Sequence, residues 1–161
     1  MTRSLSARAL SNRGFSLIEL VIVVVIIGII AAIAIPRMSR GAAGAADSSL
    51  QSNLRVLRNA VDLFYTEHAN TYPALATIAT QLSQFSDEAG ATAATQSATH
   101  IFGPYLREIP ALPVGARRGQ KGISDTTGAT IGWLYTAATG QVRANTVASE
   151  MDARGVLYST Y

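Results

Sequence analysis

A single acidic residue, Glu19, stands in the most apolar segment of the 161-residue chain. The segment runs from Phe15 to Ile35, and fifteen of its 21 residues are Phe, Leu, Ile or Val. As a helix it would be about 31 Å long, close to the roughly 30 Å hydrocarbon core of a bilayer. Placing a carboxylate in the membrane costs free energy, so the presence of Glu19 indicates a functional role and a cationic partner.

The apolar side chains of this segment outweigh its acid. At about −0.3 to −0.6 kcal/mol each, fifteen of them contribute roughly −4.5 to −9 kcal/mol to insertion. An acid at the bilayer centre costs about 3 kcal/mol, and Glu19 should cost less because it lies near the start of the segment. The sequence therefore predicts a membrane-spanning helix.

Three interpretations of this segment compete. A secretory signal peptide has a basic start and an apolar stretch of about 7–15 residues, but this stretch is longer and has an acid near its front. A plain membrane anchor fits the length and leaves Glu19 protonated or among lipid head groups. The third is a helix that is processed and then assembles.

The arginines on either side of the segment weakly favour an orientation with the N-terminus on the cytoplasmic side. Three lie before the segment and two after it: Arg3, Arg8, Arg13, Arg37 and Arg40.

Residues 13–20, Arg-Gly-Phe-Ser-Leu-Ile-Glu-Leu, favour the third interpretation. They resemble the class III prepilin signal of type IV pilins and type II secretion pseudopilins. In that family a prepilin peptidase cuts after the glycine and methylates the new N-terminal residue. The resemblance implies that residues 1–14 are a leader, that cleavage follows Gly14, and that Phe15 becomes the N-methylated end. The offset from the cleavage point to Glu19 also resembles the family pattern.

Cleavage would change the charges around Glu19. It removes three arginines and creates one amine at Phe15, about one helical turn from the carboxylate. As subunits pack, the amine of one can pair with Glu19 of a neighbour. At about 4 Å and an effective dielectric constant near 20, such a pair gains roughly 4 kcal/mol before desolvation. We therefore expect Glu19 to set the register of assembly.

The stretch from Gly28 to Pro36 is a second part of this segment with an expected role in assembly. In the family, the stretch between a glycine and a following proline tends to lose helicity when the filament forms, and Gly28 to Pro36 is the matching segment. Proline also removes a helical hydrogen bond. A simpler alternative stays open, because small residues are frequent in membrane helices.

The remaining residues offer little for catalysis or ligand binding. The chain has no cysteine and no Walker, Gly-x-Ser-x-Gly or His-Glu-x-x-His motif, so we predict that it is not an enzyme and needs no cofactor. The two histidines, His68 and His100, are expected to be exposed. Some major pseudopilins bind calcium in an acidic C-terminal loop, but here only Glu150 and Asp152 are weak candidates, and calcium needs about six to eight oxygen ligands.

The charge distribution argues against a nucleic-acid partner. The formal net charge of +3 includes three arginines of the leader, and the other ten basic residues are balanced by ten acidic ones. A nucleic-acid-binding domain needs a basic stripe or patch. Arg117, Arg118 and Lys121 form only a short cluster in an expected loop.

Beyond the apolar segment, helical periodicity continues from about Asp47 to Ala69. We expect one long, bent helix, with Asp47, Ser48 or Ser49 as a possible cap of a new start. Residues 70–73 should end this helix, residues 75–86 should form a short helix, and residues 87–99 should form a loop. The core-facing residues of the long helix are Leu50, Leu54, Leu57, Val61, Phe64 and Tyr65.

The last part of the chain predicts a small sheet. Gly140 should supply the positive φ of a hairpin turn between the second and third strands, and Trp133 should anchor the core. Residues 156–161 should add an edge strand or a tail that packs back. The strands are expected at about 119–124, 130–136 and 140–146.

Together these features predict an α+β fold, in which a long N-terminal helix packs on a small antiparallel sheet of three to four strands, and the resemblance implies that this is the pilin fold. Four parts follow along the chain. They are a cleaved leader (1–14), a membrane and filament-core helix (15–36), an amphipathic half of the helix (37–69) and a globular domain (70–161).

The resemblance implies a structural subunit of a type II secretion pseudopilus, held by a single pass in the inner membrane with its C-terminal domain on the periplasmic side. The implied partners are copies of itself, related minor subunits, prepilin peptidase, an inner-membrane assembly platform and a cytoplasmic assembly ATPase. A type IV pilin of an adhesion or motility fibre is one alternative, although the cysteine-closed loops common there cannot form here. A membrane-tethered binding module is another.

Overall fold

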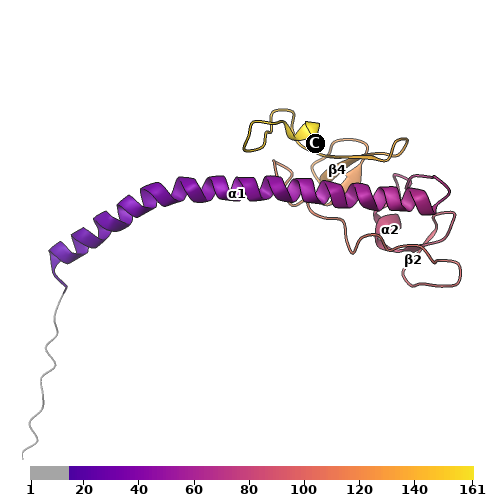
Figure 1. Ribbon diagram of the computed structural model, residues 1–161, viewed down its shortest axis with the longest axis horizontal. Helices are drawn as coiled ribbons and strands as arrows, with labels where there is room; N and C mark the ends of the chain where they lie inside the picture. Colours follow the sequence, from indigo (N-terminus) through magenta and orange to yellow (C-terminus); the bar gives the residue numbers. More distant parts are fainter. Residues whose placement is uncertain (1–14) are drawn as a thin grey trace, which may run out of the picture. The chain divides into compact units, whose positions relative to one another are not determined.

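The computed structural model describes residues 15–161 and divides the chain into two compact units, one up to Ser39 and one from Arg40 to Tyr161. Helix α1, Leu17–Glu67, contributes to both units (Figure 1). All other helices and strands that the structure describes belong to the second unit, which we call the globular unit. The α+β class predicted from the sequence is confirmed.

Within the globular unit α1 is amphipathic, as predicted. The side chains on its core face are at most 2% exposed: Leu50, Leu54, Leu57, Val61 and Phe64. The opposite face, with Arg55 and Asp62, is exposed. Because α1 runs without interruption from Leu17, the new helix start considered near Asp47 does not occur.

α1 ends at Glu67, slightly before the break predicted at residues 70–73, and the turn covers residues 68–70. Ala69 and Asn70 have positive φ angles of 52° and 59°. The backbone N–H of Asn70 donates to the carbonyl oxygen of Tyr65 at 3.0 Å, which satisfies a carbonyl that the helix end would leave without a donor. The chain then reverses toward α2.

The second helix is shorter than predicted. α2 covers Ile78–Ser83 rather than 75–86, because strand β1, Phe85–Ser86, follows at once and pairs in antiparallel fashion with β2, Thr92–Ala93. The predicted loop over 87–99 is therefore interrupted by two residues of strand. The apolar face of α2 is buried, with Ile78 and Leu82 at most 2% exposed.

The main sheet has three strands in the order β3–β4–β5: Gly122–Ser124, Ile131–Thr136 and Gln141–Ala144. β4 and β5 form the predicted antiparallel hairpin, with Gly140 at φ 68° in its turn. β3, however, pairs with β4 in parallel, so the prediction of a wholly antiparallel sheet is wrong for this strand. A parallel pair with so short a connection is possible because a three-residue strand requires the chain to return by only about 10 Å.

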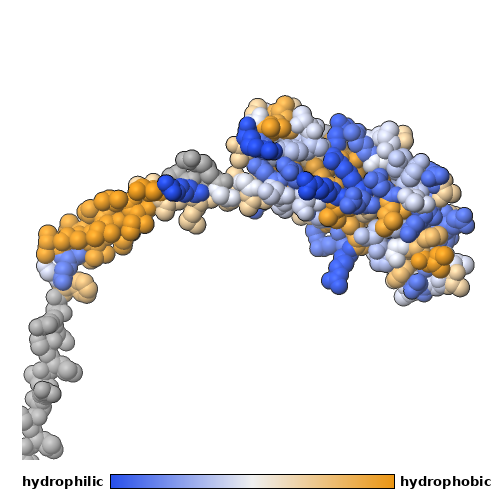
Figure 2. Space-filling model, in the orientation of Figure 1, coloured by the Kyte–Doolittle hydropathy of each residue, from blue (hydrophilic) through white to orange (hydrophobic). Residues whose placement is uncertain are grey.

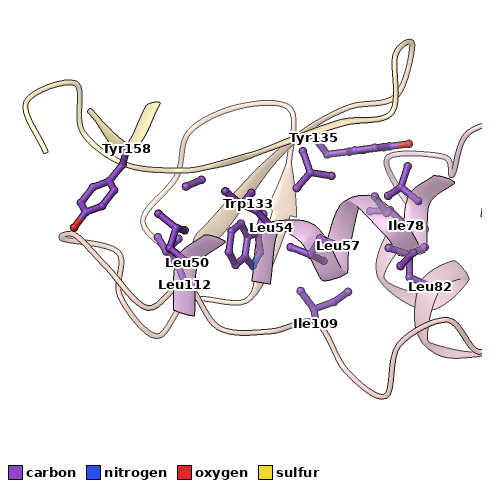
Figure 3. Close-up of a cluster of buried hydrophobic side chains, with 14 of the residues drawn as sticks. Leu50, Leu54, Leu57, Ile78, Leu82, Ile109, Leu112, Trp133, Tyr135 and Tyr158 are labelled. Carbon is purple, nitrogen blue, oxygen red and sulfur yellow. The ribbon is translucent and has the colours of Figure 1, made fainter. Parts of the chain in front are cut away.

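Trp133 of β4 anchors the core, as predicted. Its side chain is 0% exposed, and its Nε1 donates to the carbonyl oxygen of Pro110 at 2.8 Å. Figure 3 shows the ring among the leucines of α1 and of the connecting loop, which belong to the same buried cluster. The sheet and α1 thus share one apolar core, and burial of its side chains stabilises the globular unit.

The C-terminal segment, residues 146–161, returns to α1. The carboxylate of Asp47, which is 8% exposed, accepts hydrogen bonds from the Tyr158 hydroxyl at 2.5 Å and from the Ala153 N–H at 2.9 Å. Burial, together with the Asp47 carboxylate, raises the pKa of Tyr158 above its usual range. Residues 156–161 therefore pack back as a tail, which ends in the 3-10 helix η1, Tyr158–Thr160.

Candidate processing and assembly segment

Glu19 caps the N-terminal end of α1. Its Oε2 accepts a hydrogen bond from the backbone N–H of Ser16 at 3.0 Å. This is the reaching-back half of a capping box, in which an acid at the third helical position satisfies the N–H of the residue before the helix. The signal Ser-x-x-Glu is present at residues 16–19 and could have predicted this role. A negative charge in the first turn is also favourable to the helix dipole.

The apolar part of α1 has the length of a membrane span. Leu17–Ile35 is long and apolar enough to cross a bilayer, at about 28 Å of helix. The large apolar side chains of this segment are exposed in the chain by itself, from 46% at Val21 to 80% at Leu17. Figure 2 shows them as a continuous hydrophobic surface. Water cannot solvate such a surface favourably, so it requires lipid or other apolar helices around it.

Gly28 and Pro36 both lie inside the helix. A Cβ added at Gly28 would meet no atom within 4 Å, so nothing within the described chain requires glycine there. α1 also continues through Pro36, which has no N–H and leaves the carbonyl of Ala32 without its helical donor. The expected loss of helicity between these two residues concerns the assembled filament and stays a prediction.

The comparison with protein families decides what kind of N-terminus this is. Residues 10–35 match the family described as the prokaryotic N-terminal methylation motif. The chain carries a class III signal of the type IV pilin kind. The match spans the residues that carry the resemblance together with the apolar helix, and ends before the globular unit. Neither the curated proteins nor the solved structures give a match to the chain.

The expected cleavage point lies at the border of the described residues. Gly14 and the leader, residues 1–14, are outside them, and Phe15 is the first residue described. Phe15 is exposed and precedes the helix. Between Phe15 and the first helical residue, Leu17, lies only Ser16, whose N–H donates to the Glu19 carboxylate.

His68 corrects one expectation. It is only 2% exposed, and its ring stacks on Phe64 with centroids 3.7 Å apart. Nδ1 donates to the carbonyl oxygen of Phe64 at 2.8 Å, and Nε2 lies 3.0 Å from the hydroxyl of Ser86. The prediction of an exposed histidine is wrong because His68 lies four residues after Phe64, on the core face of the helix. The partly exposed His100 hydrogen-bonds only within residues 97–100.

The two weak calcium candidates are engaged by protein donors. The Glu150 carboxylate accepts the N–H groups of Ala116 and Val147 at 2.6 and 2.9 Å. Asp152 accepts the Tyr161 hydroxyl at 2.6 Å and the Arg154 guanidinium at 2.9 Å. The Tyr161 hydroxyl is the main cause that lowers the pKa of Asp152. From residue 15 onward no three His, Asp or Glu side chains lie close enough together to hold a metal ion.

Proposed function

We propose that this protein is the precursor of a filament subunit, processed by prepilin peptidase between Gly14 and Phe15 and assembled into a type II secretion pseudopilus. The observation that supports this most directly is the methylation motif at residues 10–35, joined to a helix of membrane-spanning length. Behind the span, an amphipathic half of the same helix carries a small α+β globular unit. The protein acts as a building block and not as an enzyme.

The hydrogen bonding of Glu19 supports a role in assembly. One of its oxygens, Oε2, holds the Ser16 N–H, while Oε1 makes no hydrogen bond within the described chain. After cleavage, Oε1 is available to the Phe15 ammonium group of a neighbouring subunit. An unpaired carboxylate is costly in an apolar environment, and a paired one costs less. Subunits therefore associate in the register that brings the amine of one to Glu19 of the next.

The location and partners follow from the same chemistry. The precursor spans the inner membrane once through Leu17–Ile35, with the globular unit on the periplasmic side. Its partners are further copies, related minor subunits, prepilin peptidase, an inner-membrane assembly platform and a cytoplasmic ATPase that supplies the work of extraction. Gly28 to Pro36 is the stretch that loses helicity as subunits enter the filament.

The absence of cysteine from the chain favours a pseudopilus over a type IV adhesion or motility pilus. Pilins of those fibres commonly close a C-terminal loop with a disulfide. Here Tyr158 and Asp47 attach the C-terminal segment to α1 by hydrogen bonds instead. Fibres that form only with a type II secretion platform would support the pseudopilus, and fibres that require a type IV pilus platform would favour the alternative.

Replacing Glu19 with alanine tests the assembly role. Because losing one partner of a buried ion pair costs about 3–5 kcal/mol, Glu19→Ala should lower the yield of sheared fibres tenfold or more, while membrane insertion stays normal. The matched control is Glu108→Ala, since Glu108 forms an exposed pair with Lys121 and such pairs contribute about 0–1 kcal/mol. Unchanged fibre yield in Glu19→Ala would refute the pairing, and a wild-type protein that stays a membrane monomer would support a tethered binding module.

A further inference from the structure

A groove rich in arginine runs beside α1, along its border with the C-terminal segment. It encloses about 320 Å³, which is at the lower end of the range for ligand pockets and is enough for one side chain of a partner. Three of the six residues that line it are arginines, and none is acidic. The lining residues are Gln51, Leu54, Arg55, Arg58, Arg154 and Tyr161.

Two of these arginines are held in place and keep donors to spare. Arg58 donates its Nε and Nη2 to the carbonyl oxygen of Val142 at 3.2 and 3.0 Å. Arg154 donates its Nε to Asp152 and its Nη2 to the Tyr161 hydroxyl. Arg55 makes no hydrogen bond within the described chain. Since each guanidinium has five N–H donors, the groove presents several oriented donors and excess positive charge, which suits a carboxylate.

The globular unit also has carboxylates that accept no hydrogen bond from its described residues. There are two, Asp62 and Glu88, and both are exposed. Asp62 lies on the same side as the groove, in a neighbouring hollow that shares Arg58. Glu88 belongs to the loop between β1 and β2, on a different surface that Phe64 and His68 also line. Figure 1 shows the β2 loop and the C-terminal segment on different sides of α1.

The positions of the two acids determine what each could build. Asp62 and the groove belong to one patch, and when such a patch meets the same patch of a second copy across a two-fold axis, the contact closes a dimer. Glu88, on another surface, reaches the groove of a second copy in a head-to-tail contact, and such contacts repeat without closing. We propose that the arginine groove receives the Glu88 carboxylate of a second copy of this chain. The proposal rests on the proposed function and adds a lateral contact between globular units.

Cysteine cross-linking tests the contact directly, because the chain has no cysteine of its own. In the double variant Gln51→Cys, Ala89→Cys, one cysteine lies in the groove and the other beside Glu88. Mild oxidation of fibres should give a ladder of disulfide-linked multimers on non-reducing gels. Adding Arg55→Glu, or separately Glu88→Arg, should lower the ladder yield roughly tenfold, because like charges then meet. Combining the two reversals should restore it.

Arg107→Glu is the matched control, since Arg107 is exposed, makes no hydrogen bond within the described chain and lies outside the groove. It should leave the ladder unchanged, and circular dichroism should show that every variant is folded. Fibres without a ladder, or an equal loss in the Arg107 control, would overturn the contact and leave the filament function standing. Closed dimers in place of a ladder, if Asp62→Arg removes them, would also overturn the Glu88 contact. A wild-type chain that forms no fibres would overturn the proposed function and this contact together.

Discussion

The hydrogen bond between Tyr158 and Asp47 offers a quantitative test of how the C-terminal segment is attached to α1. The Tyr158 hydroxyl donates to Asp47 at 2.5 Å in a site where both residues are at most 8% exposed. Tyr158→Phe removes the donor and keeps the ring. Asp47→Ala removes the acceptor and also leaves the Ala153 N–H without its partner. The two changes thus act on one small network from opposite sides.

The magnitude follows from the charge and the burial of the pair. A hydrogen bond to a charged group contributes about 1.5–3 kcal/mol, so Tyr158→Phe should lower the free energy of unfolding by that amount. At about 4 °C per kcal/mol for a unit of this size, Tm should fall by about 6–12 °C. Asp47→Ala should lower the free energy of unfolding by about 2–4 kcal/mol, because the Tyr158 hydroxyl and the Ala153 N–H both lose their acceptor. The double variant should cost about 1–2 kcal/mol less than the sum of the single variants.

The assay is thermal unfolding of the full chain in detergent, followed by near-UV circular dichroism, for the wild type, both single variants and the double variant. Tyr65→Phe is the matched control, because the Tyr65 hydroxyl makes no hydrogen bond within the described chain. Its free energy of unfolding should change by no more than about 0.5 kcal/mol. If the losses of the two single variants add fully in the double variant, Tyr158 and Asp47 do not interact, and the proposed hydrogen bond is contradicted.

Two further predictions concern pH and backbone conformation. Burial raises the pKa of Tyr105, Tyr135 and Tyr158 above the usual value of 10.0, so their contribution to stability is complete below about pH 10 and is lost as the pH rises toward the folded-state pKa. Absorbance at alkaline pH should show these three ionising only as the protein unfolds, and three tyrosines that ionise independently of unfolding would contradict it. Gly140→Ala should destabilise by more than about 1 kcal/mol, because φ is 68° and the new Cβ would meet the Tyr72 ring. Gly155→Ala has a similar φ of 83° and open space, so chemical denaturation should show a clearly smaller loss, and equal losses would rule out the clash.

The parts of the fold that were predictable from the sequence are those with strong periodicity. Leucines at helical spacing must share one face, so burial of Leu50 and Leu54 follows once any core exists. The β4–β5 hairpin was predictable because Gly140 marks its turn and Trp133 its buried face. The apolar segment and its single acid were predictable because the segment has the roughly 20 consecutive apolar residues that a membrane-spanning helix needs.

The remaining features depend on contacts that no local pattern encodes. β1 and β2 have two residues each, too few for any alternation to appear. The parallel pairing of β3 depends on where a six-residue loop returns the chain. The burial of His68 was partly predictable, because it lies four residues after Phe64, whereas no local spacing indicates its contact with Ser86 of β1. The hydrogen bonds of Asp47 could not be predicted either, because its donors lie more than 100 positions further along the chain. The capping role of Glu19, in contrast, was readable in Ser16-x-x-Glu19.

The most direct test of the whole account is the N-terminus of the mature protein. Intact-mass and N-terminal fragment spectra of protein purified from cells with prepilin peptidase should show a chain that begins at Phe15 and carries one added methyl group. Gly14→Ala should leave the uncut precursor, whereas Gly41→Ala, a change with open space around it in α1, should be processed normally. A mature chain that begins at any residue other than Phe15 would place the amine away from Glu19 and contradict the account.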